Sequence, residues 1–98
     1  MKIRGAAFDD PASLIREVER HQQAHRDRLA RYLAGELRDF TGPDAPAPLD
    51  AGQELQHVVL RGGIAQERMT IAWLDDVLAT LHRLGRSAPS APPSPRTA

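Results

Sequence analysis

Two histidines, His21 and His25, lie four residues apart in a stretch without proline. In an α-helix this spacing places both imidazoles on one face, where they are able to bind zinc. A structural zinc site takes four ligands, but the glutamate of an HExxH motif is missing and the chain has no cysteine. His57 and His82 supply ligands only if the fold brings them close. We therefore expect no metal ion and no cofactor, and predict that His21 and His25, with Gln22, form a buried polar seam that sets how two helices pair.

Glu67 lies on the helical wheel inside an apolar arc, where an unpaired carboxylate is costly to bury. Its expected partners are His25, Arg28 or Arg31 of the preceding helix, or their copies in a second subunit. The alternative is a catalytic acid, which needs a second carboxylate or a nucleophile beside it, and the sequence places none there. We predict a buried ion pair, no catalytic residue and no enzymatic activity. A small helical enzyme that uses Glu67 or a histidine is the minority alternative.

The helix that must position this carboxylate is predicted over residues 51–84. Asp50 is a favourable N-cap, and Gln53 three positions later completes a pair like a capping box. Gly85 suits the position just after the helix, and Pro89 follows as a stop signal.

Two adjacent glycines, Gly62 and Gly63, lie in the middle of this helix. Each costs about 1 kcal/mol relative to alanine, and the expected benefit is close approach by another helix. The alternative is a kink or break at this point.

A first helix is predicted over residues 11–39, with Asp10 as its cap and Pro11 at its first position. The connection, residues 41–49, holds three prolines and a glycine and is long enough for the helices to lie antiparallel. Residues 85–98 are rich in proline, serine and alanine and are expected to be disordered. The predicted fold is all-α: a hairpin of two long helices in a domain of residues 1–84, followed by a tail.

The second helix is apolar over about twice the arc of an ordinary surface helix. A wheel drawn at about 100° per residue separates two apolar groups, which suggests two packing partners: the first helix and a second copy of the chain. Four aromatic residues are few for a self-sufficient core, which also favours oligomerisation. We predict a homodimer in which the second helices meet. The predicted interface residues are Leu60, Ile64, Ile71, Trp73, Leu74, Leu78 and Leu81.

Three neighbouring side chains, Gln66, Met69 and Trp73, share one side of the same helix. Tryptophan and methionine are able to line a pocket for a flat ligand. A single tryptophan at helical spacing more often anchors an interface. These residues are therefore a candidate ligand pocket, and an interface anchor is the favoured interpretation of Trp73.

The composition excludes several classes of protein. Thirteen basic and thirteen acidic side chains cancel, so no net field draws the chain to nucleic acid or to a membrane surface. The absence of cysteine excludes disulfides and thiol catalysis. The sequence has no apolar run long enough to span a bilayer and no signal peptide, so we expect a cytoplasmic protein.

Part of the chain resembles the C-terminal domain of PadR-type transcriptional regulators, also called the virulence-activator alpha C-terminal domain. The resemblance covers about residues 3–84. The matching positions of the second helix are Arg61, Gly63, Ile64, Ala65, Glu67, Trp73, Leu74, Asp75 and Leu78, and those nearer the N-terminus are Phe8, Asp10, Pro11, His25, Arg26, Arg28 and Leu29.

This resemblance implies a helical dimerisation domain that follows a DNA-binding winged helix, and in some members an aromatic effector between subunits. Residues 1–9 are too few for a winged helix, so the chain is expected not to bind DNA by itself. It is interpreted as a truncated regulator, an isolated domain or a stand-alone descendant. The predicted function is dimerisation, with effector sensing, in a PadR-like regulator. The alternative is a stand-alone small-molecule-binding protein, or an enzyme derived from one, that uses a cavity between subunits.

Overall fold

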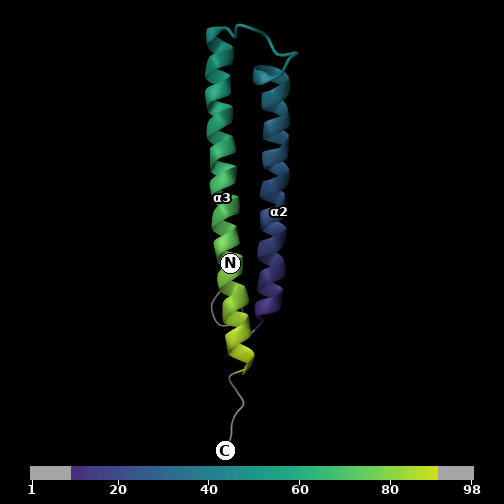
Figure 1. Cartoon of the computed structure of the whole chain (residues 1–98), viewed down its shortest axis with the longest axis vertical. Helices are drawn as coiled ribbons and strands as arrows, with labels where there is room; N and C mark the ends of the chain where they lie inside the picture. The colour runs from purple at the N-terminus through teal and green to yellow at the C-terminus, as the bar shows by residue number, and fades with distance from the viewer. Residues whose placement is uncertain (1–9, 91–98) are drawn as a thin grey trace, which may run out of the picture. The chain divides into compact units, whose positions relative to one another are not determined.

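The computed structural model describes residues 10–90, with side chains to residue 86, and it is all-α over this range. Helix α2 runs over Pro11–Glu36, a π-helical turn η1 over Leu37–Thr41, and helix α3 over Ala51–Ser90 (Figure 1). The described residues contain no strand. The predicted hairpin of two long helices is therefore the observed fold class.

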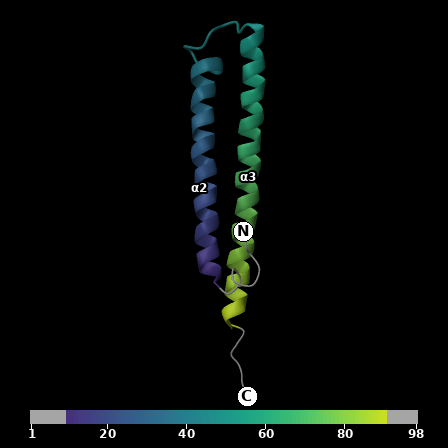
Figure 2. The ribbon, with the colours of Figure 1, turned by 180° about the vertical axis from the view of Figure 1, so that it is seen from behind.

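Contacts divide the chain into two compact units. Unit 1 consists of residues 1–21 and 73–98, and unit 2 consists of residues 22–72. Within the described part of each unit, a segment of α2 runs antiparallel beside a segment of α3 (Figures 1 and 2). Unit 2 also contains the connection between the helices, and with it most of the residues discussed below.

Local hydrogen bonds fix where both helices begin. The carboxylate of Asp10 accepts a bond from the backbone N–H of Ser13 at 3.3 Å. The N–H of Gln53 donates to Asp50 Oδ1 at 2.8 Å, and the N–H of Asp50 donates back to Gln53 Oε1 at 2.9 Å. This reciprocal pair is a capping box, which satisfies two backbone donors that the first turn leaves free. Both predicted starts are confirmed.

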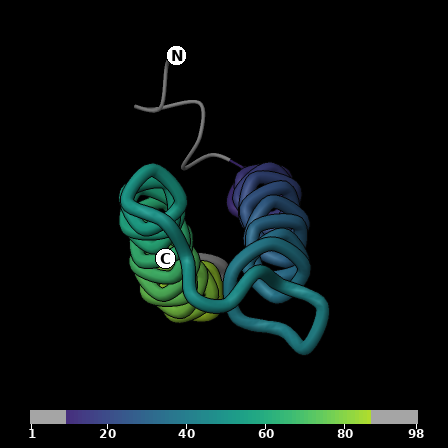
Figure 3. Tube along the Cα trace, turned by 90° about the horizontal axis from the view of Figure 1, so that it is seen from above, coloured from purple at the N-terminus to yellow at the C-terminus, as the bar shows by residue number. Residues whose placement is uncertain are grey.

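The end of α2 differs from the prediction of residue 39. The α-helix ends at Glu36 and continues as the wider turn η1 to Thr41. Gly42 closes the turn by donating its N–H to the carbonyl of Leu37 at 2.7 Å. A Cβ at Gly42 would lie 2.3 Å from that carbonyl oxygen, so only glycine fits this closure. Figure 3 shows the connection that follows, from the end of η1 to the start of α3.

The second helix is longer than predicted. It continues past Gly85 and includes Pro89, so residues 85–90 are helical and the expectation that they are disordered is wrong. A glycine lowers helix propensity without forbidding the helix, and Pro89 in the last turn removes only one backbone donor. The rest of the predicted tail, residues 91–98, lies outside the described residues.

Helix α3 also runs without interruption through Gly62 and Gly63, so the alternative of a break there is wrong. The two glycines have different surroundings. A Cβ at Gly63 would lie 3.2 Å from Cε2 of Tyr32, whereas a Cβ at Gly62 would have nothing within 4 Å. Gly63 therefore lies under an aromatic ring of α2, and Gly62 faces open space.

This difference gives a matched pair of substitutions. Gly62→Ala is expected to raise the free energy of unfolding by up to about 1 kcal/mol, because alanine has the higher helix propensity and meets no neighbour. Gly63→Ala gains the same propensity, but the ring of Tyr32 must shift by a few tenths of an ångström, so its net effect should be smaller or unfavourable. Urea denaturation at one protein concentration measures both. Equal stabilisation by the two variants would contradict this account.

Candidate functional site

Within unit 2, the apolar surface of α3 falls into two rows of residues. The inner row faces α2 and consists of Leu60, Ile64, Glu67 and Ile71, which are all buried or half-buried. The outer row is exposed and consists of Leu55, Val59, Gly62, Gln66 and Met69.

Glu67 is the charged member of the inner row, and its side chain is only 8% exposed. His25 Nδ1 lies 2.6 Å from Glu67 Oε1, and Arg28 Nη1 donates to Glu67 Oε2 at 3.2 Å. Both partners come from α2 and are among the three that the sequence suggested; Arg31, the third, is exposed. Each carboxylate oxygen thus has its own donor, which is the condition for burying a carboxylate.

These contacts lower the pKa of Glu67. The hydrogen bond with His25 is the main cause, and the hydrogen bond and charge of Arg28 act in the same direction. Burial acts in the opposite direction, because it disfavours the charged form. The carboxylate is therefore held ionised, as an ion-pair partner should be, and a proton-donating catalytic role has no support from this geometry.

The predicted polar seam is present, but one residue is misplaced. Gln22 is buried, and its Nε2 donates to the backbone carbonyl of Ile71 at 3.0 Å. His25 is half-buried beside Glu67. His21 is exposed and lies 3.3 Å from Glu17 on its own helix, so the prediction that His21 is buried is wrong. Neighbouring residues differ by about 100° around a helix, which turns His21 outward when Gln22 turns inward.

A second cross-helix pair in unit 2 was not predicted. His57 Nε2 lies 2.8 Å from Glu36 Oε2, and the ring of His57 stacks on Phe40 with centroids 4.9 Å apart. Glu36 is the last residue of α2 and Phe40 lies in η1, so the π-helical turn brings the ring over the histidine. The signal that could have identified this pair is the spacing of His57. It lies three residues before Leu60 and seven before Ile64, so it continues the inner row toward the start of α3.

The predicted interface residues are for the most part covered by their own chain. Ile64, Leu74 and Leu81 are the buried hydrophobic residues of the described chain. Their burial within the single chain leaves them little exposed surface, and their assignment to a dimer interface stays a prediction. Leu60, Ile71 and Leu78 are half-buried, and only Trp73 is largely exposed, at 60%. The sequence showed two apolar groups but not which of them α2 covers.

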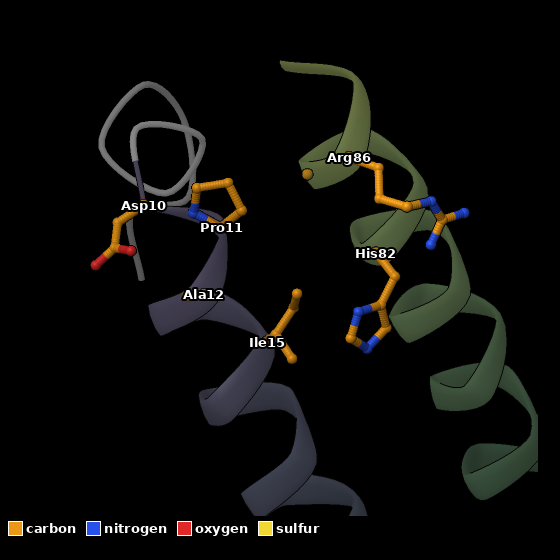
Figure 4. Close-up of a pocket in the computed structure, with 7 residues that line it drawn as sticks. Asp10, Pro11, Ala12, Ile15, His82 and Arg86 are labelled. Atoms are coloured by element: carbon orange, nitrogen blue, oxygen red, sulfur yellow. The ribbon is translucent and has the colours of Figure 1, made fainter. Parts of the chain in front are cut away.

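The candidate ligand residues Gln66, Met69 and Trp73 are all exposed, and the prediction that they line a ligand pocket stays a prediction. A pocket of about 370 Å³ lies elsewhere, in unit 1, where Ile15 of α2 and His82 of α3 both extend into the space between the helices (Figure 4). A polar pocket of about 360 Å³ lies in unit 2 beside Phe40. Both are open surface hollows, and neither contains the predicted residues.

Two further features of residues 10–90 bear on the class of protein. No group of three or more histidine, aspartate or glutamate side chains in this range is placed to hold a metal ion. None of the described helices combines the length and the apolar character that crossing a membrane requires.

Comparison with known proteins gives two matches. Residues 1–82 match the model of the family described as virulence activator alpha C-term. A protein of Mycobacterium tuberculosis named "Probable transcriptional regulator" is 38% identical over 81 residues, which is 83% of this chain and 41% of that protein. The chain thus spans about two-fifths of the length of this relative. No solved structure matches.

The buried carboxylate leads to a prediction for pH and mutation. Because the pKa of Glu67 is lower in the folded chain than in the unfolded chain, its ion pairs stabilise the fold at neutral pH. This contribution starts to fall as the pH approaches the ordinary carboxyl value of about 4.3 and is lost as the pH falls through the lowered pKa. Glu67→Gln should lower the thermal midpoint by several degrees at pH 7 and flatten its decline below about pH 5.

The matched control is Glu19→Gln, which alters an exposed glutamate of α2. Thermal unfolding followed by circular dichroism between about pH 7 and pH 3 measures both variants. If the two variants had the same midpoint and the same pH profile, Glu67 would not be the stabilising carboxylate.

Proposed function

Because the chain belongs to the virulence activator alpha C-terminal family, we propose that it is the dimerisation and effector-sensing domain of a PadR-like transcriptional regulator. In this role the chain forms a homodimer through α3. Another part of the regulator binds DNA, and the regulator is a cytoplasmic protein. The name of the mycobacterial relative supports a regulatory role. The observation that carries the dimer is the exposed outer row.

The outer row is unusual because its large apolar members are exposed together on one helix side. Leu55, Val59 and Met69 are 65%, 69% and 65% exposed, and the adjacent Val58 is 56% exposed. Single exposed apolar residues are ordinary, but a contiguous group on one face marks an interaction surface. A second copy of the chain supplies a surface of the same kind, so both copies would remove apolar area from water on pairing.

The charge distribution argues against direct DNA binding. The chain has no net charge, and the arginines of α2 alternate with acidic residues such as Glu17, Glu19 and Asp27. A DNA-binding face requires a net basic stripe that neutralises phosphates. The outer row itself contains no charge. Protein–protein contact is therefore the interaction that this surface favours.

Effector sensing is proposed for the same surface in the paired state. Gln66 offers one amide and Met69 one thioether, a combination that suits a small aromatic molecule with a polar group. Met1 and Met69 are the only methionines, so the methionine methyl spectrum of the labelled protein has two signals. Titration with a panel of small aromatic acids and amides is expected to shift the Met69 signal for at least one member. Absence of any shift across the panel would remove the effector part of the proposal.

The dimer is tested by a single charge placed in the outer row. Wild-type protein is expected to have the mass of a dimer in light scattering at micromolar concentration. Val59→Glu should raise the dissociation constant by about tenfold or more, because pairing would bury an unpaired carboxylate in each copy. The helical circular dichroism should persist, since Val59 is exposed in the single chain.

Ala24→Glu is the control, because it adds the same charge at an exposed position of α2. It should leave the dimer unchanged. A wild-type protein that is monomeric at these concentrations would refute the dimer, and equal weakening by both variants would show that the outer row is not the contact.

A further inference from the structure

We propose that the polar hollow beside Phe40 binds a small planar organic cation, one that carries an amidinium or guanidinium group. The hollow has a volume of about 360 Å³ and lies in unit 2, where it is lined by residues of η1, of the connection and of the start of α3. This volume is at the lower end of the range for ligand pockets, so it suits a small molecule. The site shares no residue with the outer row, and the inference does not depend on the proposed dimer.

Two walls of the hollow are held in place by contacts that a ligand would not disturb. The ring of Phe40 is stacked on His57 with an angle of 6° between the planes, and His57 in turn lies 2.8 Å from Glu36. The side chain of Gln53 is fixed because its Oε1 accepts the backbone N–H of Asp50. A site whose walls are already fixed loses little conformational entropy when a ligand binds, so even a small ligand is able to bind measurably.

The charged side chains that line the hollow leave one carboxylate for a ligand. Arg38 Nε donates to Asp39 Oδ1 at 2.9 Å, and Arg38 Nη2 donates to Asp39 Oδ2 at 3.0 Å, so both oxygens of Asp39 are occupied. The carboxylate of Asp44 is exposed, and it makes no hydrogen bond or ion pair within the part of the chain that the structure describes. Asp44 is therefore the anion to which a bound cation would pair.

The distribution of charge along the chain determines the sign of the ligand. Residues 36–57 contain five acidic side chains and one basic side chain, Arg38, whereas the rest of the chain contains eight acidic and twelve basic side chains. The segment that surrounds the hollow thus has a formal charge of −4 with His57 neutral, although the whole chain has none. Such a field concentrates cations near the hollow and repels carboxylates and phosphates.

The uncharged residues of the hollow favour a planar cation. An amidinium, like a guanidinium, is flat, and it pairs with a carboxylate through two parallel N–H···O bonds. Asp44 supplies the carboxylate, and Gln56 adds an amide oxygen as a further acceptor. Phe40 and Pro46 supply apolar surface, against which the flat face and the body of the ligand would pack. A spherical ammonium ion would use the charge of the site but not its apolar walls.

Three probes of nearly the same shape test the site: benzamidine, a cation at neutral pH, benzamide, which is neutral, and benzoate, an anion. Each is titrated into the full chain labelled with ¹⁵N and followed by NMR. Benzamidine should produce saturable shifts in the backbone amide signals of residues 38–46 and in the side-chain amide signals of Gln53 and Gln56. Benzamide should bind about tenfold more weakly because it lacks the charge, and benzoate should not bind. The absence of saturable shifts with benzamidine, or equal affinities for benzamidine and benzamide, would overturn the proposal.

A matched pair of variants separates direct contact from the general field. Asp44→Asn should weaken benzamidine binding about fivefold, as expected for the loss of one solvent-exposed ion pair. Glu54→Gln removes an exposed carboxylate from the same acidic segment but from outside the hollow, so it should weaken binding less than about twofold at physiological salt. Both residues are exposed, so both variants should keep the helical circular dichroism of the wild type.

Equal weakening by the two variants would overturn the assignment of Asp44 as the paired carboxylate. The methyl signal of Met69 reports on the outer row and should stay unchanged with benzamidine. Shifts at Met69 without shifts at residues 38–46 would place the cation on the outer row and overturn the proposal. Neither result depends on whether the chain is a dimer, so failure of the dimer and failure of this site are distinguishable.

Discussion

The constraint that governs unit 2 is that a helix with two apolar rows cannot cover both of them with one neighbour. The inner and outer rows of α3 lie roughly 150° apart at about 100° per residue, on nearly opposite sides of the helix. Helix α2 covers the inner row, and Val59 and Met69 of the outer row remain about two-thirds exposed. Within unit 2, packing of α2 against α3 therefore leaves the outer row uncovered. The proposed pairing of two copies follows from this remainder.

Polar contacts set how α2 and α3 align within unit 2. Gln22 reaches the carbonyl of Ile71, His25 and Arg28 reach Glu67, and Glu36 reaches His57. From one contact to the next, the residue number on α2 increases while the residue number on α3 decreases by a similar amount. All of these contacts therefore belong to one antiparallel register. Leucine and isoleucine would tolerate a shift by one helical turn, but a buried carboxylate would lose both donors and remain unpaired. The apolar residues of the inner row thus provide the attraction, and the polar ones specify the alignment.

The parts of this fold that sequence reasoning could predict are those set by local chemistry. Asp10, and Asp50 with Gln53, mark helix starts because their side chains bond to backbone groups three residues away. The end of α3 was missed because Gly85 and Pro89 weaken a helix without necessarily ending it. The wheel alone shows two apolar groups as equivalent and does not indicate which of them α2 covers. The distinguishing feature is Glu67: the group that contains a carboxylate is the one that α2 covers, since α2 supplies His25 and Arg28.

The size of the core connects the fold to the assembly. Among the described residues only Ile64, Leu74 and Leu81 are buried hydrophobic side chains, and none is completely buried. A helical hairpin with so small a core gains little free energy from its own packing, since each buried aliphatic side chain contributes about 1.5–3 kcal/mol. Contacts made only by the folded chain add to its stability by mass action, so pairing through the outer row would stabilise the hairpin as well as join two copies. Folding and dimerisation would then be linked. A substitution in the outer row would change both the stability of the hairpin and the affinity of the two copies.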